Sequence, residues 1–298
     1  MRKLLLMFLG AVLVYTASAQ DVRPQQGVRL EKTYSVDANA QMMSKSVYEY
    51  DANGRQTLQY DYAYTDGVLV NTVKTVFNYD DQGRLVKSEG YESDGGDFTL
   101  TGYSENSEFD AENRATVVTE YELDEANPTA GLQKKSKTVI KKFNGLAAED
   151  WELYTWTGSD WALNITSHSD FNDQGLPTQT TATMSVMGMM MTNTVKMEYD
   201  EHWQVVKSES SSGYGLVTTQ EYKNSYDADG NLVVQTASTM GVEVTMYLFW
   251  QKDGSTGIGR VLATDAPNAY YDLGGCRLNG IPTSKGIFIR NGKKVLIK

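Results

Sequence analysis

The sequence predicts an all-β fold, an antiparallel β-meander or repeat array of two-strand units about 29 residues long, with a small β domain at its C-terminus. Tyr or Phe before Asp or Asn recurs at a steady spacing of 27 to 34 residues, with the Asp or Asn of the seven copies at positions 51, 80, 110, 144, 172, 200 and 227. The segments between these positions are rich in Val, Thr and Tyr and partly alternate polar with apolar residues, which is typical of β-strands.

Each repeat begins with a turn signal. In Asp227-Ala228-Asp229-Gly230, the Asp and the Gly occupy the first and fourth positions that a type I turn with a following bulge prefers. A second turn, as in "YTDGVLV" or "SSSGYG", is expected at the opposite end of each unit. Trp203 interrupts the pattern and the Asn144-Gly145 copy is shortened. The predicted turn residues are Asp51, Gly54, Asp80, Gly83, Asp110, Asn172, Gly175, Asp227 and Gly230.

One two-strand unit cannot bury its apolar face, so stacked neighbours are expected to stabilise one another. A transmembrane barrel is the architectural alternative, and its strands need an apolar outward face. Segments such as "KTVIKKF" and "VKSESSSG" carry Lys and Ser too densely for contact with lipid. We therefore expect a chain that does not span a membrane.

The N-terminus carries an export signal. Arg2 and Lys3 precede an apolar stretch, and Ala17-Ser18-Ala19 is a small-residue cleavage site, so residues 1–19 read as a signal peptide cleaved after Ala19. The expected domains are the β-repeat domain at 20–252 and a C-terminal β domain at 253–298. The single cysteine, Cys276, excludes an intramolecular disulfide framework.

The charge is unevenly distributed. The net charge is -11, but residues 273–298 hold six Lys or Arg and no Asp or Glu, so the body between the signal peptide and this tail is far more acidic than the whole. Because such a body is repelled by phosphate backbones, nucleic acid is not an expected partner.

The segments "YDANGR", "YDDQGRL" and "YDADGNL" resemble the YD repeats of Rhs-type proteins, and their alternation with "YTWTGSDW" resembles extracellular repeat proteins of Bacteroidetes-type bacteria. That resemblance covers residues 45–235 and implies β-sheet shells or spirals, with no particular activity.

The tail resembles the C-terminal sorting domain of type IX secretion cargo. This resemblance implies the type IX machinery as a partner and a secreted or outer-surface location. The alternative is a hairpin that caps the repeat array. The matching residues are Tyr271, Asp272, Leu273, Gly275, Arg277, Lys285, Gly286, Gly292, Lys293, Lys294 and Lys298.

Trp151, Tyr154, Trp156 and Trp161 form the best candidate ligand site. Such aromatic rings suit the C–H faces of a glycan, whereas the structural alternative is cross-strand pairing that stabilises a hairpin. Calcium at Asp227, Asp229 and Asn231 is disfavoured because no bidentate Glu follows within a twelve-residue loop. A methionine cluster between Met184 and Met197 suits either copper(I) or the filling of core gaps.

No catalytic residues are assigned. His168 and His202 lack a nucleophile elbow or a second zinc-binding His, and 38 acidic residues make carboxylate pairs uninformative without geometry. We expect no cofactor and no resident metal. The expected function is an exported, non-catalytic module that binds a glycan or a protein in adhesion. The alternatives are a passive structural spacer and a polysaccharide hydrolase.

Overall fold

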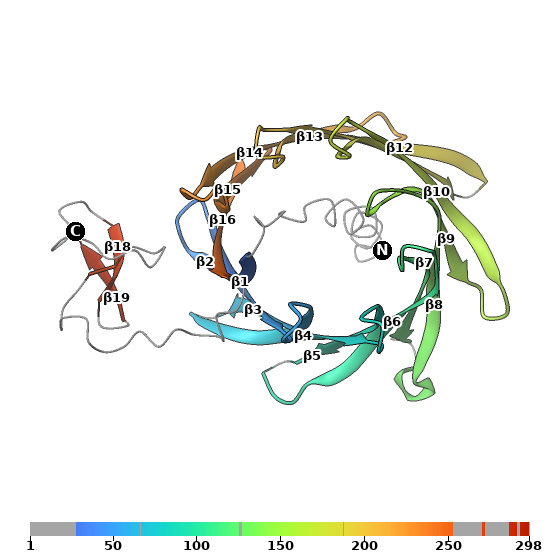
Figure 1. Cartoon of the computed structure of the whole chain (residues 1–298), viewed down its shortest axis with the longest axis horizontal. Helices are drawn as coiled ribbons and strands as arrows, with labels where there is room; N and C mark the ends of the chain where they lie inside the picture. Colours follow the sequence, from blue (N-terminus) through green and yellow to red (C-terminus); the bar gives the residue numbers. More distant parts are fainter. Residues whose placement is uncertain are drawn as a thin grey trace.

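The computed structural model describes residues 28–65, 67–93, 95–124, 127–186, 188–252, 270–271, 286–290 and 293–297. The chain is all-β and antiparallel, which confirms the predicted fold class. The description as a repeat array of two-strand units is not supported, because β1 to β16 form one closed barrel (Figure 1). β1 pairs with β16 from Val28–Lys252 to Asp37–Val244, so the barrel strands leave no free sheet edge.

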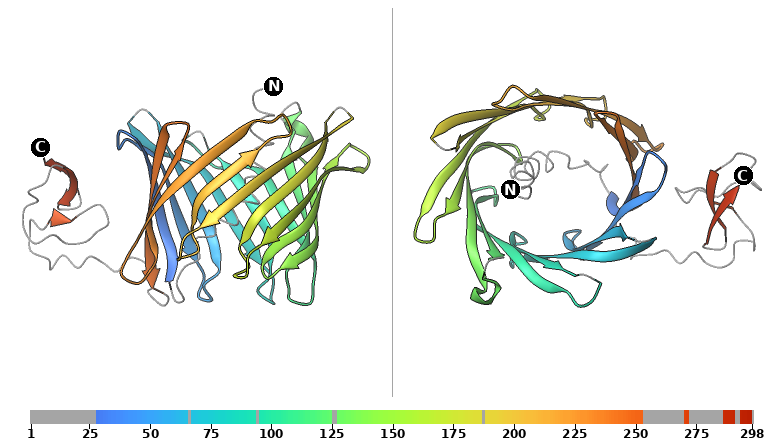
Figure 2. Two further views of the ribbon diagram at one scale, coloured as in Figure 1. Left: turned by 90° about the horizontal axis from the view of Figure 1, so that it is seen from above. Right: turned by 180° about the vertical axis from the view of Figure 1, so that it is seen from behind.

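The barrel strands follow one another in sequence order around the ring, and Figure 2 shows their tilt. Their bounds are β1 (Val28–Asp37), β2 (Met42–Tyr50), β3 (Gln56–Thr65), β4 (Val68–Tyr79), β5 (Leu85–Glu92), β6 (Thr99–Phe109), β7 (Ala115–Leu123), β8 (Leu132–Asn144), β9 (Ala147–Trp156), β10 (Trp161–Phe171), β11 (Pro177–Val186), β12 (Met189–Tyr199), β13 (Val205–Ser211), β14 (Val217–Tyr226), β15 (Leu232–Thr239) and β16 (Val242–Lys252). A short 3-10 turn, η2 (Pro128–Ala130), precedes β8.

Successive hairpins alternate between the two ends of the barrel. The end that carries the β2–β3, β4–β5 and later even-to-odd turns is called the Asp rim. There Asp51 Oδ1 accepts the N–H groups of Asn53 and Arg55, each at 2.9 Å, and its Oδ2 pairs with the Arg55 guanidinium. Gly54 completes the turn with φ +83°. The same contacts recur at Asp80 and Asp110.

Two irregular copies of the turn differ in outcome. The turn at Asp200 keeps its hydrogen bonds although Trp203 stands in place of Gly, and Trp203 adopts a φ of +64°. Asn144 instead pairs directly with Ala147, which leaves only Gly145 and Leu146 in the loop. The turn at Asp200 therefore keeps the backbone hydrogen bonds of the regular turns despite Trp203. The shortened copy at Asn144 is a different, tighter turn.

An aromatic residue before each turn ties neighbouring hairpins together. The Tyr79 hydroxyl donates to the Gln56 carbonyl oxygen at 2.8 Å, while the Arg55 guanidinium lies 4.7 Å from the centre of the Tyr79 ring. At the next two turns, the arginine lies 4.2 Å from the ring centres of Phe109 and Phe143. Each of these three turns is thus held in contact with the aromatic residue of the following hairpin.

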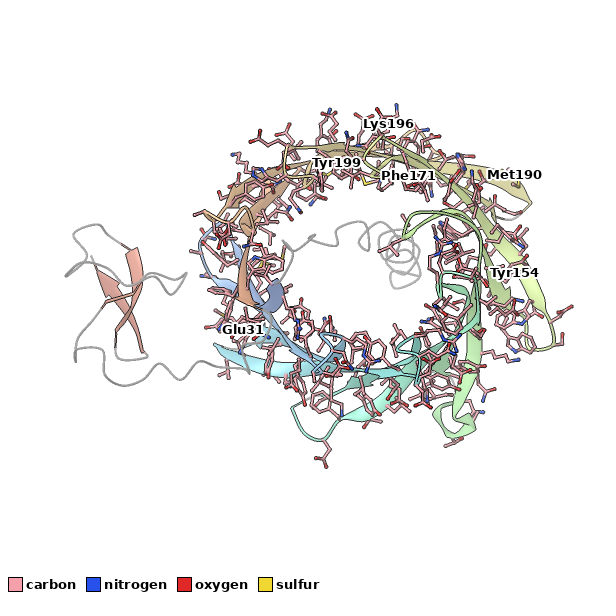
Figure 3. The ribbon with its side chains drawn as sticks, in the orientation of Figure 1. Glu31, Tyr154, Phe171, Met190, Lys196 and Tyr199 are labelled. Atoms are coloured by element: carbon pink, nitrogen blue, oxygen red, sulfur yellow. The ribbon has the colours of Figure 1, made fainter. Side chains whose placement is uncertain are left out.

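The two faces of the wall differ in chemistry. Figure 3 places Tyr154, Met190 and Lys196 outside the ring and Phe171 and Tyr199 inside it. Two residues that pair directly across neighbouring strands point to the same face of the sheet. The strand registers therefore assign an outward or inward direction to residues on every barrel strand. Lysines then point outward on half of the barrel strands, namely Lys32, Lys45, Lys74, Lys87, Lys137, Lys196, Lys207 and Lys223.

The best-packed apolar cluster lies on the inner face. Trp151, Ile165, Ala182 and Met184 are all buried, and Ile165 is only 1% exposed. Ile165 pairs directly with Met184 on β11 and with Leu153 on β9, so three strands contribute to one cluster. The described residues include no helix that is long and apolar enough to cross a membrane.

The C-terminal part contains a separate three-stranded antiparallel sheet of β17 (Tyr270–Tyr271), β18 (Gly286–Arg290) and β19 (Lys293–Ile297). Of the predicted sorting residues, Tyr271, Gly286, Lys293 and Lys294 lie on these strands. The other sorting residues, Cys276 and the signal peptide lie outside the described residues. The sorting role and the domain boundaries stay predictions.

We expect Ile165→Ala to destabilise the barrel by about 2–5 kcal/mol, because it removes a fully packed side chain and leaves a cavity. Chemical denaturation followed by tryptophan fluorescence measures this. Leu163→Ala on the same strand is the control, since Leu163 is 51% exposed. Equal losses of stability in the two variants would contradict the assignment of the core to the inner face.

We expect Asp80→Ala to lower the melting temperature more than Asp80→Asn, because Asn retains an oxygen that accepts the turn N–H groups. The Arg84 amide and then its guanidinium hold the pKa of Asp80 below its usual value. The stabilisation is therefore present above the ordinary Asp pKa and is lost as the pH falls through the lowered one. Thermal melts of wild type and both variants across acidic pH test this, and identical pH profiles would refute it.

Candidate functional site

The outer wall of β8, β9 and β10 carries the candidate site. Trp156 and Trp161 stand directly opposite each other across the β9–β10 hairpin, with ring centroids 5.0 Å apart and planes inclined at 64°. Tyr154 faces outward on β9, in register with Leu163 (Figure 3). The Trp pair has the edge-to-face geometry that stabilises hairpins, and its rings remain partly exposed.

Two lysines from β8 lie over these rings. Lys134 Nζ is 4.9 Å from the Trp156 ring centre, and Lys137 Nζ is 4.9 Å from that of Tyr154 and 5.0 Å from that of Trp161. Among the described residues, neither lysine forms a salt bridge with a carboxylate. We call this set, Lys134, Lys137, Tyr154, Trp156 and Trp161, the aromatic–lysine patch.

Trp151 does not belong to this patch. It pairs with Ser167 on the inner face, is 5% exposed and packs in the apolar cluster. Because successive strand residues alternate between faces, an odd separation from Trp156 already places Trp151 on the other side. The four aromatic residues that the sequence grouped together are therefore divided between the two sides of the wall.

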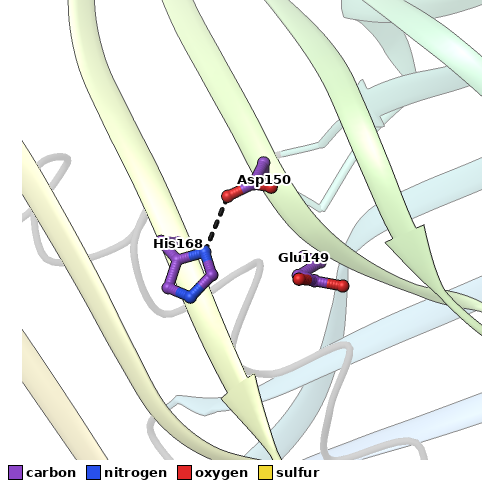
Figure 4. A group of neighbouring side chains, drawn as sticks. All are labelled: Glu149, Asp150 and His168. Carbon is purple, nitrogen blue, oxygen red and sulfur yellow. Dashed lines mark hydrogen bonds and ion pairs between the residues drawn. The ribbon is translucent and has the colours of Figure 1, made fainter.

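A second group, Glu149, Asp150 and His168, lies farther along the same outer wall (Figure 4). His168 and Asp150 are paired across β9 and β10, with Nδ1 2.7 Å from Oδ1. Adjacent strand residues normally point to opposite faces, but the register shift between Lys142 and Phe143 leaves Glu149 as an extra residue. This bulge brings two consecutive carboxylates close to one imidazole.

The ligand atoms of this group lie within 4.8 Å of one another, a donor set that suits a divalent transition metal. Each acid already has a cationic partner, because Lys142 pairs with Glu149 and His168 with Asp150. A metal ion would have to displace both contacts. The hydrogen bond to Asp150 raises the pKa of His168, and Asp170, with Oδ1 3.4 Å from Nε2, reinforces that increase.

The remaining metal candidates are used in folding contacts. Asp227 Oδ1 accepts the N–H groups of Asp229 and Asn231, each at 2.9 Å, so the carboxylate serves its own turn. The methionines do not converge on one point. Met184 and Met197 are buried and face inward, whereas Met190 is 71% exposed and faces outward (Figure 3).

Sequence reasoning missed the two lysines of the patch. It also missed an eighth member of the series of aromatic residues that precede the turns of the Asp rim. Trp250 on β16 donates from Nε1 to the Leu232 carbonyl oxygen at 2.7 Å, the same kind of contact that Tyr79 makes with Gln56. The signal was present as "WQKDG", in which Gln251 stands 24 residues after Asp227, but Trp and Gln replace the expected Tyr and Asp.

No family model matches the chain, and no curated protein matches it. Among solved structures, it is similar to a porin-like protein from Bacteroides uniformis, with a TM-score of 0.48, 11% identity, and coverage of 74% of this chain and 96% of that one. A porin-like protein from Bacteroides vulgatus gives a TM-score of 0.36 at 8% identity, covering 74% and 97%. A Bacteroides fragilis protein of unknown function gives 0.30 at 17%, covering 38% and 81%.

We expect the pKa of His168 to lie above the usual histidine value and to fall in Asp150→Asn, because the amide no longer favours the charged imidazolium. While Asp150 is ionised, the stabilisation from this pair is complete below the ordinary histidine pKa and is lost as the pH rises through the raised pKa. An NMR titration of the imidazole in wild type and variant measures the change. A pKa that is the same in both proteins would contradict the Asp150 contact.

Proposed function

We propose that this chain is an exported, non-catalytic binding protein that recognises an acidic glycan, one carrying uronate carboxylates, at the aromatic–lysine patch. The proposal rests chiefly on one observation. Two lysines without a carboxylate partner among the described residues stand beside three outward aromatic rings. Aromatic rings match the C–H faces of pyranose rings, and an ammonium group next to them matches a sugar carboxylate.

The charge of the surroundings favours binding of an anion at the lysines of the patch. The chain has a net charge of -11, so an anionic polymer is repelled from most of its surface. Elsewhere on this wall Lys141 is paired with Glu152 and Lys142 with Glu149. Lys134 and Lys137 are thus available to an anionic ligand at low cost, because binding exchanges a cation–π contact for an ion pair without breaking a salt bridge.

The proposal includes a barrel that stands in water rather than in a bilayer. Its outward lysines occur near the middle of strands, where a lipid-facing wall needs an apolar belt. Lys207 on β13, for example, pairs with Glu198 on β12 at 3.2 Å, on the outer face. Charges at such positions favour an aqueous surround, which leaves the patch accessible to a soluble or surface-bound glycan.

We expect oligogalacturonate to bind to the wild-type chain and its affinity to fall at least tenfold in Trp156→Ala/Trp161→Ala and in Lys134→Ala/Lys137→Ala. Isothermal titration calorimetry gives both affinities. Binding should weaken with salt for the wild type and much less for the lysine variant, since the lysines supply the electrostatic part.

Trp203→Asn is the matched control, because Trp203 is 51% exposed but lies at the Asp rim. A neutral xylo-oligosaccharide tests the requirement for the carboxylate. Absence of saturable binding to the wild type would favour a passive spacer, and release of reducing sugars from oligogalacturonate would favour a hydrolase. Either result would overturn the proposed function.

A further inference from the structure

The end of the barrel opposite the Asp rim, here called the tip rim, exposes large apolar side chains along one part of its circumference, which only the polar β1–β2 tip interrupts. Val68, Met190, Tyr214, Leu216, Met240 and Val242 are each between 61% and 83% exposed. They come from the β3–β4, β11–β12, β13–β14 and β15–β16 hairpins, which are brought together because β16 pairs with β1. We call these six residues the apolar arc.

The exposure is concentrated at one end. Of the large apolar side chains that are exposed among the described residues, only Leu146 and Trp203 lie in turns of the Asp rim. Two of the contributing tips also lack charge, since residues 211–217 and 239–242 contain no acidic or basic residue, whereas the β3–β4 tip contains Asp66. Soluble proteins seldom gather such side chains at one edge without a binding partner.

We infer that the apolar arc docks onto the surface of a zwitterionic lipid bilayer, so that the barrel stands on the membrane without spanning it. A bilayer is flat and closes around each tip separately, which suits side chains spread over several hairpins. Met, Leu and Val enter the acyl boundary and Tyr214 stays at the headgroup level, as in interfacial anchors.

The neighbouring residues limit how far the tips enter. Glu243 directly follows Val242, and the outward lysines begin farther down the strands, so deeper insertion would bury charge. The other half of the tip rim carries exposed acids, Asp97, Asp124 and Asp160, which favour a tilt that lifts this half toward water.

A second copy of the chain is a poorer occupant of the arc. Two rims meeting end to end touch only at separate hairpin tips, and small point contacts of this kind bury little area. Two chains that each carry a net charge of -11 also repel each other. A lipid bilayer can surround each tip, so the contact area is not limited to points. A zwitterionic surface has no net charge, so it does not repel the acidic chain.

The test is flotation of the chain from Gln20 onward with phosphatidylcholine vesicles. We expect the wild type to float, at low and at high salt, and Met190→Ser/Leu216→Ser/Met240→Ser to partition at least tenfold less because apolar burial is lost. Leu146→Ser/Trp203→Asn is the matched control, since it removes the exposed apolar residues of the Asp rim and should float like the wild type.

A wild type that stays in solution would overturn the inference, as would a control variant that loses as much binding as the triple variant. Sedimentation velocity without vesicles addresses the second copy: a dimer that the triple variant abolishes would replace lipid as the occupant. Equal melting temperatures establish that the variants are folded. Trp156→Ala/Trp161→Ala should float normally, so failure of the glycan proposal is distinguishable from failure of this one.

Discussion

The barrel depends on the contact between each Asp turn and the aromatic residue of the next hairpin. The turn at Asp80 is typical: its carboxylate fixes the backbone and orients Arg84, whose guanidinium then lies over Phe109. Each such cation–π contact or hydrogen bond is worth only about 0.5–1.5 kcal/mol. Repetition around the ring makes them important, because each contact joins one hairpin to its neighbour and so fixes the register of the sheet.

The same contact continues across the seam where the two ends of the barrel sheet meet. Trp250 on the last barrel strand donates to Leu232, and Tyr50 donates to the Leu30 carbonyl oxygen on the first strand at 2.8 Å. Leu30 in turn pairs with Trp250 in the β1–β16 ladder. The seam is therefore held by the same kinds of interaction as the other hairpins.

Closure assigns different chemistry to each surface. The outward wall carries paired lysines and acids, and the inner face carries the packed cluster around Ile165. The two rims also differ in chemistry. Charge and hydrogen bonding dominate the Asp rim, whereas the tip rim exposes the apolar arc. With the glycan patch on the wall and the lipid contact at one end, both proposed partners can bind the barrel at the same time.

Local sequence determined the strands and turns of this protein, because Asp and Gly at fixed positions in a turn act within five residues. Face assignment was also within reach, since alternation alone separates Trp151 from Trp156. Tertiary structure decided the rest. Closure of the sheet into a barrel depends on the number of strands and on their twist. The bulge at Glu149 depends on the register of β8 against β9. Likewise, Val68 and Val242 share one arc only because β1 pairs with β16, a contact between opposite ends of the barrel sequence.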